Sequence, residues 1–222
     1  MNNTKSKREI LRQKRKEQKR KRTIAFIIVV VIAIILFSSA AFLPKLLMGK
    51  TKYENTNGFS IGDPDAPVTV TEFSSYSCGH CKNYSETYES NFVATYVDTG
   101  LVYFTYINLP NSSEESLAAA EASYCAAEQN LFFEYKEYLF TYSGSDNGFS
   151  ESNLISYAAS AGLDVDQFQA CMDSDLYADA YLDDYEYATY AGLTGTPSFF
   201  VNDTSLVYSS TLYETIEAYL GN

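Results

Sequence analysis

Hydrophobic positions divide the chain into one uninterrupted apolar run near its start and a longer part with strand-like or helical periodicity. Residues 23–43 contain no charged side chain. As a helix these 21 residues would extend about 31 Å, close to the hydrocarbon thickness of a bilayer. A signal-peptide core is shorter, about 7–15 residues, although Ser39-Ala40-Ala41 offers small residues for cleavage. The length favours an uncleaved transmembrane anchor, with a cleaved signal peptide as the alternative.

The pattern after residue 58 predicts a strand, a helix and a second strand. VTVTEF (68–73) alternates after the turn-forming GDPDAP and is typical of a strand. A helix is predicted over residues 83–97 from apolar side chains at every fourth position: Tyr84, Tyr88, Phe92 and Tyr96. LVYFTYINL (101–109) predicts the second strand, which Pro110 ends. This order begins a βαβ unit.

A long helical stretch follows, and a short strand pair and a helix come after it. Five helices are predicted between about 112 and 192, the first opening at SSEE (112–115), which has capping-box spacing, and the last covering 175–192. SFFV (198–201) and LVY (206–208) predict a hairpin, and a final helix opens at TLYE (211–214). The pattern predicts an α/β fold that carries an inserted all-α block.

Charge distinguishes the segment before the apolar run from everything after it. Residues 1–22 carry eleven Lys or Arg and two acids, a net charge of +9, so the positive-inside rule keeps this tail in the cytoplasm and sends the rest across the membrane. From residue 45 on, 5 Lys and 26 acids leave a net charge of −21, which excludes nucleic-acid binding by this part. Residues 44–58 read as a linker and 59–222 as one domain.

The motif Cys78-Gly79-His80-Cys81 contains the only histidine of the chain. It lies after the first predicted strand and at the opening of the first predicted helix. Helix N–H groups and the helix dipole favour a thiolate at Cys78, and His80 can donate a hydrogen bond or a positive charge to it. Both effects stabilise the dithiol over the disulfide, which makes the disulfide a stronger oxidant. The motif predicts a redox-active pair tuned by His80.

Other interpretations of the motif have less support. A zinc site needs further ligands, and the chain has no second CxxC and no His pair. A purely structural bridge would close a very short loop and add little stability. A redox-inactive binding domain that retains the motif stays open as an alternative.

Cys125 and Cys171 fall in two separate predicted helices. An even cysteine count in an exported protein favours pairing. A disulfide between them would close a loop of about 47 residues and contribute about 4 kcal/mol in the loop-entropy model. Two buried free cysteines that behave as small hydrophobic residues are the alternative.

Three blocks, in this order, resemble the DsbA-like thiol–disulfide oxidoreductases of the thioredoxin superfamily. They are GDPDAPVTVTEFSSYSCGHC (62–81), AEASYCAAEQNLFFEYKEYLF (120–140) and GTPSFFVN (195–202). The resemblance covers residues 62–219 and implies a thioredoxin-like fold with an all-α insertion. It also implies a cis peptide bond before Pro197 and a Thr196 backbone that pairs with an extended substrate segment. An ordinary trans proline is the alternative.

Glu72, six residues before Cys78, matches the family's buried acid under the active site. In the alternation of its strand it shares a face with Val68 and Val70, which points it inward. A carboxyl buried there would have a raised pKa and could take the proton of Cys81 during exchange. A rim carboxylate in solvent is the alternative.

The resemblance implies dithiol–disulfide exchange at Cys78, with Cys81 as the resolving thiol and without a metal or organic cofactor. The expected function is an anchored oxidase that forms disulfides in exported proteins and is reoxidised by a membrane quinone-linked oxidoreductase. A reductase or isomerase of the same fold and a non-catalytic binding module are the alternatives. Isomerases of this type usually dimerise through an extra domain, and none is visible in this sequence, while Gly-His between the cysteines favours the oxidase. We expect a monomer.

Overall fold

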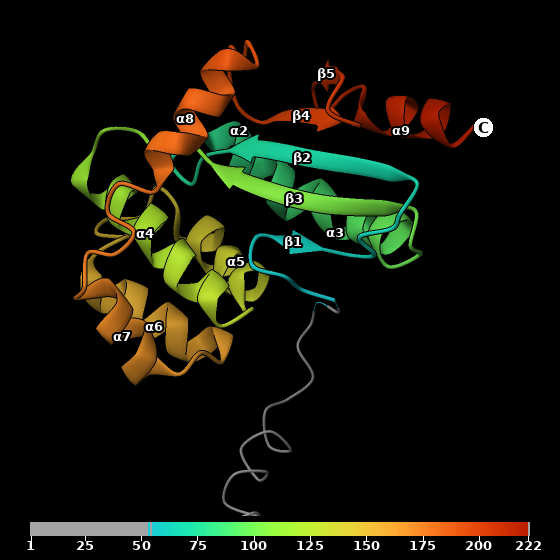
Figure 1. Ribbon diagram of the computed structural model, residues 1–222. Helices are drawn as coiled ribbons and strands as arrows, with labels where there is room; N and C mark the ends of the chain where they lie inside the picture. The colour runs from blue at the N-terminus through green and yellow to red at the C-terminus, as the bar shows by residue number, and fades with distance from the viewer. Residues whose placement is uncertain (1–52, 54, 222) are drawn as a thin grey trace, which may run out of the picture. The chain divides into compact units, whose positions relative to one another are not determined.

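The computed structural model describes residue 53 and residues 55–221, shown in Figure 1. The predicted basic tail (1–22), the predicted anchor (23–43) and residues 44–52 and 54 of the predicted linker lie outside the described residues. None of the helices in the described part is long and apolar enough to cross a membrane.

A five-stranded sheet with the order β1-β3-β2-β4-β5 forms the centre of the domain. The strands are β1 (Ser60–Ile61), β2 (Val68–Ser74), β3 (Val102–Asn108), β4 (Ser198–Val201) and β5 (Ser205–Val207). β2 and β3 are parallel, with Val68 opposite Val102, and the other neighbouring strands are antiparallel. The predicted strands are confirmed. β1 was not predicted, because two residues are too few to show an alternation.

The helix after β2 begins earlier than predicted and contains two wide turns. It runs through α2 (Gly79–Tyr84), η1 (Ser85–Glu89), α3 (Ser90–Phe92) and η2 (Val93–Val97), where η marks π-helical turns. Hydrogen bonds in a π turn span five residues instead of four, so a strict four-residue repeat is lost. Tyr88, one of the four apolar positions of the predicted repeat, is 47% exposed, and Glu89 is buried instead.

Five helices lie between β3 and β4, as predicted, and a sixth follows the hairpin. They are α4 (Glu114–Glu128), α5 (Phe132–Tyr142), α6 (Glu151–Ala161), α7 (Val165–Met172), α8 (Tyr181–Tyr190) and, after β5, α9 (Leu212–Leu220). In Figure 1, α4 to α7 form one group below the sheet, while α8 lies beside the carboxyl ends of β2 and β3. α4 packs on α5 and α7, and α6 packs on both α5 and α7.

Two predicted helix starts, those of α4 and α8, are wrong in detail, whereas α9 opens at Thr211 as predicted but without the expected side-chain cap. The N-cap of α4 is Ser113, whose hydroxyl accepts a hydrogen bond from the N–H of Ser116, so the expected SSEE box at 112–115 does not form. At α9 the N-cap Thr211 makes no side-chain capping bond. α8 begins at Tyr181, not at Asp175, because Asp175 has φ +51°, which a right-handed helix does not accommodate.

Different helices cover the two faces of the sheet. Val68, Val70 and Phe104 lie on the face that packs against the helix after β2 and against α5 and α9. Phe73 and Phe200 lie on the other face, in a smaller cluster that α8 covers through Ala188. Glu72 is on the first face and therefore points into the larger core.

Candidate active site

Cys78 is the residue at which the chain turns from β2 into α2. β2 ends at Ser74, and the N–H of Cys78 donates to the carbonyl of Ser75 at 3.0 Å. Cys78 is then the N-cap of α2, and its carbonyl accepts from the N–H of Lys82 at 3.0 Å. The strand and the helix together hold one partly exposed sulfur at the end of the sheet.

The surroundings of Cys78 lower the pKa of its thiol. Partial burial raises the pKa, but the hydrogen bonds from the Thr196 side chain and from the N–H groups of Cys81 and His80 outweigh it. These N–H groups belong to the first turn of α2, where no carbonyl of the helix competes for them. The thiolate of Cys78 is therefore favoured.

Cys81 has the opposite environment. Its side chain is fully buried, and burial raises the pKa of its thiol to about 12. The two cysteines are not bonded to each other, so the structure represents the dithiol form. Cys78 is thus the sulfur that a second molecule can reach, and Cys81 is held protonated behind it.

His80 is exposed on the first turn of α2. In the part of the chain that the structure describes, its imidazole makes no hydrogen bond to either sulfur, whereas its backbone N–H contributes to the lowered pKa of Cys78. A role of the imidazole in tuning the pair stays a prediction.

The segment before β4 lies directly beside Cys78. The Thr196–Pro197 peptide bond is cis, as the resemblance implies. The Cys78 thiol donates to the carbonyl oxygen of Thr196 at 3.5 Å. Pro197 is buried, while Thr196 is partly exposed. Thr196 is therefore partly exposed next to the sulfur, and pairing of its backbone with an extended substrate segment stays a prediction.

Cys78 lines a groove of about 380 Å³. One side is formed by α8 through Tyr185, Ala188 and Thr189, and another by Leu109 and Asn111 after β3. The Tyr185 hydroxyl donates to the carbonyl of Pro110, which ties α8 to that segment. The sequence carried no signal for these lining residues, because only the packing of α8 against the sheet brings them to Cys78.

Glu72 is fully buried, as its place in the strand alternation predicts. Among the described residues neither of its carboxyl oxygens has a hydrogen-bond partner. Burial raises the pKa of Glu72 to about 8; Lys136 opposes the rise and Glu89 adds to it. A carboxyl with such a pKa can hold or release a proton near neutral pH, whereas its part in exchange stays a prediction.

A buried ion pair that sequence reasoning missed lies in the same core. Nζ of Lys136 on α5 contacts Oε1 of Glu89, and both side chains are almost completely buried. The ammonium also lies 4.7 Å from the ring centre of Tyr106, the residue opposite Glu72 in β3. The π turn at Glu89 places its carboxylate in the core. The hydrophobic periodicity of the sequence does not predict this, because it assumes a regular α-helix.

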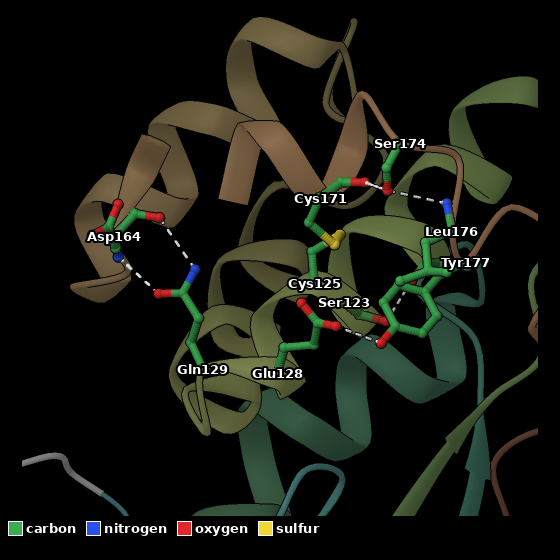
Figure 2. The surroundings of a disulfide bond; sticks show 10 residues. Ser123, Cys125, Glu128, Gln129, Asp164, Cys171, Ser174, Leu176 and Tyr177 are labelled. Carbon is green, nitrogen blue, oxygen red and sulfur yellow. Dashed lines mark hydrogen bonds between the residues drawn. A yellow bond between two sulfur atoms is a disulfide. The ribbon is translucent and has the colours of Figure 1, made fainter. Parts of the chain in front are cut away.

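Cys125 and Cys171 form a disulfide that joins α4 to α7 (Figure 2). Gln129 supports the same junction, since its side chain accepts from the N–H of Asp164 and donates to its carbonyl. The bridge belongs to the helical block. It lies apart from the residues that line the groove at Cys78.

Comparison with known sequences finds relatives for most of the described part. A family model described as Thioredoxin matches residues 54–221. The Na(+)/H(+) antiporter NhaA 1 of Mycobacterium sp. (strain KMS) is 34% identical over 146 residues, which are 64% of this chain and 23% of the antiporter. The chain thus spans under a quarter of that relative. The probable disulfide bond formation protein D of Bacillus anthracis is 28% identical over 64% of this chain and 69% of its own length.

Solved structures show the same fold. Oxidised BdbD from Bacillus subtilis matches with a TM-score of 0.67 and 24% identity, over 77% of this chain and 96% of that chain. DsbA from Chlamydia trachomatis matches with a TM-score of 0.64 and 21% identity, over 73% and 91%. The chain belongs to the thioredoxin family and has the fold of its DsbA-like thiol–disulfide oxidoreductases, with a helical block between β3 and β4.

Proposed function

We propose that this protein is a thiol–disulfide oxidoreductase that oxidises dithiols in exported proteins. One observation carries the proposal: an accessible Cys78 with a lowered pKa stands in an open groove, in front of a buried Cys81 whose pKa is raised. The name of the Bacillus anthracis relative, which refers to disulfide bond formation, supports the same reaction.

The reaction begins with the Cys78–Cys81 disulfide. A substrate thiolate attacks Sγ of Cys78, a new S–S bond forms, and the sulfur of Cys81 leaves with the electron pair. Because the thiol of Cys81 has a pKa of about 12, this sulfur takes a proton, and Glu72 is the proposed donor. A second substrate thiolate attacks the substrate sulfur of the mixed disulfide, and Cys78 leaves as a thiolate. The substrate has lost two electrons and the enzyme has gained them.

The environment of Cys78 favours this direction. A low thiol pKa makes Cys78 a good leaving group and stabilises the dithiol product. Each pKa unit corresponds to about 1.4 kcal/mol between the protonation states, and about 1.4 kcal/mol is equivalent to about 30 mV for a two-electron couple. The hydrogen bonds at Cys78 therefore support an oxidase over a reductase of the same fold.

We propose further that residues 23–43 anchor the protein, with the basic tail in the cytoplasm and the catalytic domain outside. The charge-free run and the net charge of +9 before it support this placement. A membrane quinone-linked oxidoreductase is the proposed electron acceptor of the reduced Cys78–Cys81 pair, and a monomer is the proposed state. Reduced exported proteins are the proposed substrates.

The direct test mixes the oxidised full chain in detergent with a reduced peptide that contains two cysteines. We expect stoichiometric oxidation of the peptide, and none with Cys78→Ser. With Cys81→Ser, an oxidised peptide should be trapped as a mixed disulfide at Cys78. The Cys125→Ala/Cys171→Ala variant is the control and should still oxidise the peptide. Oxidation that survives Cys78→Ser would contradict the proposal, and a wild-type protein without exchange would favour a binding module.

A further inference from the structure

We propose that the groove at Cys78 selects cysteines that lie in positively charged segments of a substrate. The inference rests on the proposed function and adds the class of substrate that the site prefers. It is carried by the charges around the groove and by the chemistry of its lining.

Positive charge is nearly absent from the surface of the described part. Lys82 and Lys136 are the only Lys or Arg residues among the described ones, and residues 137–222 contain 14 Asp or Glu and no Lys or Arg. Lys136 is buried against Glu89. The Lys82 ammonium is held by the carbonyls of Thr141 and Ser143, at 3.0 Å each. Both lysines thus have a carboxylate partner, since Lys82 also lies 3.8 Å from Glu86, and neither of them lines the groove.

Exposed acidic side chains lie on α8 and at the start of α4, two elements close in sequence to lining residues of the groove. Asp183 and Glu186 are exposed on α8, the helix that contributes Tyr185 and Thr189 to the lining. Exposed Glu114 and Glu115 form the first turn of α4, a few residues after the lining residue Asn111. Figure 1 shows α8 beside the carboxyl ends of β2 and β3. A substrate strand that reaches Cys78 therefore approaches a domain surface whose charge is strongly negative.

The lining of the groove carries no charged side chain when Cys78 is in its disulfide with Cys81. It consists of small, polar or apolar residues such as Leu109, Asn111, Tyr185 and Thr189. Such a surface accepts the aliphatic stems of Lys and Arg while their charged ends reach the acids outside. The tyrosine ring at its wall also suits a cation.

The chemistry of exchange increases the need for positive charge on the substrate. The attacking group is a substrate thiolate, and it must enter a field that is already negative to reach the Cys78–Cys81 disulfide. Lys or Arg beside the substrate cysteine offsets this repulsion during the approach. Fields of this kind change association rates by about 10- to 1,000-fold at low salt and fade as salt increases.

The test compares single-cysteine peptides that differ only in two residues flanking the cysteine: Lys, Gln or Glu. Their rates with the oxidised full chain in detergent are divided by their rates with uncharged hydroxyethyl disulfide, which removes the effect of the flanks on the peptide thiol. We expect the normalised Lys peptide to react about tenfold faster than the Glu peptide at low salt. At 0.5 M salt the difference should fall below about threefold.

Two double variants that neutralise the same number of charges test whether the acidic residues of α8 cause the selectivity between the peptides. Asp183→Asn/Glu186→Gln should reduce the selectivity to about threefold. Asp65→Asn/Asp98→Asn removes the same number of charges before the amino ends of β2 and β3, and should leave the selectivity unchanged. Equal rates for the three peptides, or an equal loss of selectivity in both variants, would overturn charge selection at the groove while leaving exchange intact. No reaction with any peptide would overturn the proposed function and this inference with it.

Discussion

The sulfur atoms of Cys78 and Cys81 are three residues apart and have opposite surroundings. Cys78 is the N-cap and receives N–H hydrogen bonds, while Cys81 lies one turn further along and is buried against the sheet. This asymmetry assigns attack to one sulfur and resolution to the other. It follows from placing the motif at a strand-to-helix turn, which the sequence alone already indicates.

Alkylation of the reduced protein tests this asymmetry. The rate at Cys78 should reach its plateau at a lower pH than that of a free cysteine, whose pKa is about 8.5, because hydrogen bonds hold the Cys78 thiolate. Cys81 should stay unlabelled in the native protein, because it is buried. Mass spectrometry after labelling across a pH series measures both. Equal labelling of the two cysteines would contradict the assignment.

The buried carboxyl of Glu72 should make stability depend on pH. Above the ordinary pKa of 4.5 the unfolded chain ionises this group, while the folded protein keeps it protonated up to about pH 8. The folded state binds more protons in this window, so its stability falls as the pH rises. Glu72→Gln has no carboxyl group to ionise at this position, so its free energy of unfolding should not fall in this way. The difference in free energy of unfolding between Glu72→Gln and the wild type should therefore grow between pH 5 and pH 8, by about 1.4 kcal/mol for each unit by which the pKa is raised.

Urea unfolding at pH 5 and pH 8 measures this difference, and exposed Glu214→Gln serves as the control. The same pair of variants tests catalysis. If Glu72 supplies the proton to Cys81, only Glu72→Gln should change the pH dependence of peptide oxidation. A stability gap that stays constant between the two pH values would contradict the buried, protonated carboxyl.

At the scale of elements, the π turns in the helix after β2 determine which of its side chains are buried. They rotate Tyr88 outward and bring Glu89 against Lys136 of α5, so the active-site helix is joined to the helical block by a buried ion pair. Removing one partner of such a pair leaves an unpaired buried charge.

Lys136→Met should therefore lower the free energy of unfolding by about 3–5 kcal/mol. Adding Glu89→Leu should restore most of that loss, because no buried charge then remains. Glu86→Gln, which removes an exposed partner 3.8 Å from Lys82, should cost less than about 0.5 kcal/mol. Denaturant unfolding measures all three variants. A double variant that is no more stable than Lys136→Met would refute the explanation.

The disulfide between α4 and α7 is a second link of the helical block. It joins residues 46 apart, so Cys125→Ala/Cys171→Ala should lose about 2–4 kcal/mol of stability in urea. The redox equilibrium of Cys78 and Cys81 should be unchanged, because the bridge does not line their groove. A shifted equilibrium in this variant would show that the helical block acts on the active site.

Periodicity predicts the regular strands and helices, in which apolar side chains recur at a constant spacing. Alternation in β2 predicted that Glu72 points inward, and the CxxC after a strand predicted the helix that starts there. The start of α8 was misplaced because Asp175 adopts a left-handed conformation that composition does not reveal. Glu89, Lys136 and the α8 wall of the groove could not be predicted, since π turns and tertiary packing determine them.

At the scale of the whole molecule, each part has a charge that suits the proposed placement. The basic tail with its net charge of +9 precedes the apolar run, and the acidic domain with the CxxC follows it. In the proposed arrangement the Cys78 groove would face proteins outside the membrane, and the redox pair would determine the direction of electron flow.

The redox equilibrium of Cys78 and Cys81 in glutathione buffers tests the central claim most directly. The full chain in detergent is equilibrated at a series of ratios, and its thiols are trapped with a mass label. We predict that the disulfide is reduced at mildly oxidising ratios, with a potential above about −200 mV, and that His80→Ala makes the pair less oxidising. A disulfide that persists until strongly reducing conditions, near about −270 mV, would contradict the oxidase and identify a reductase of the same fold.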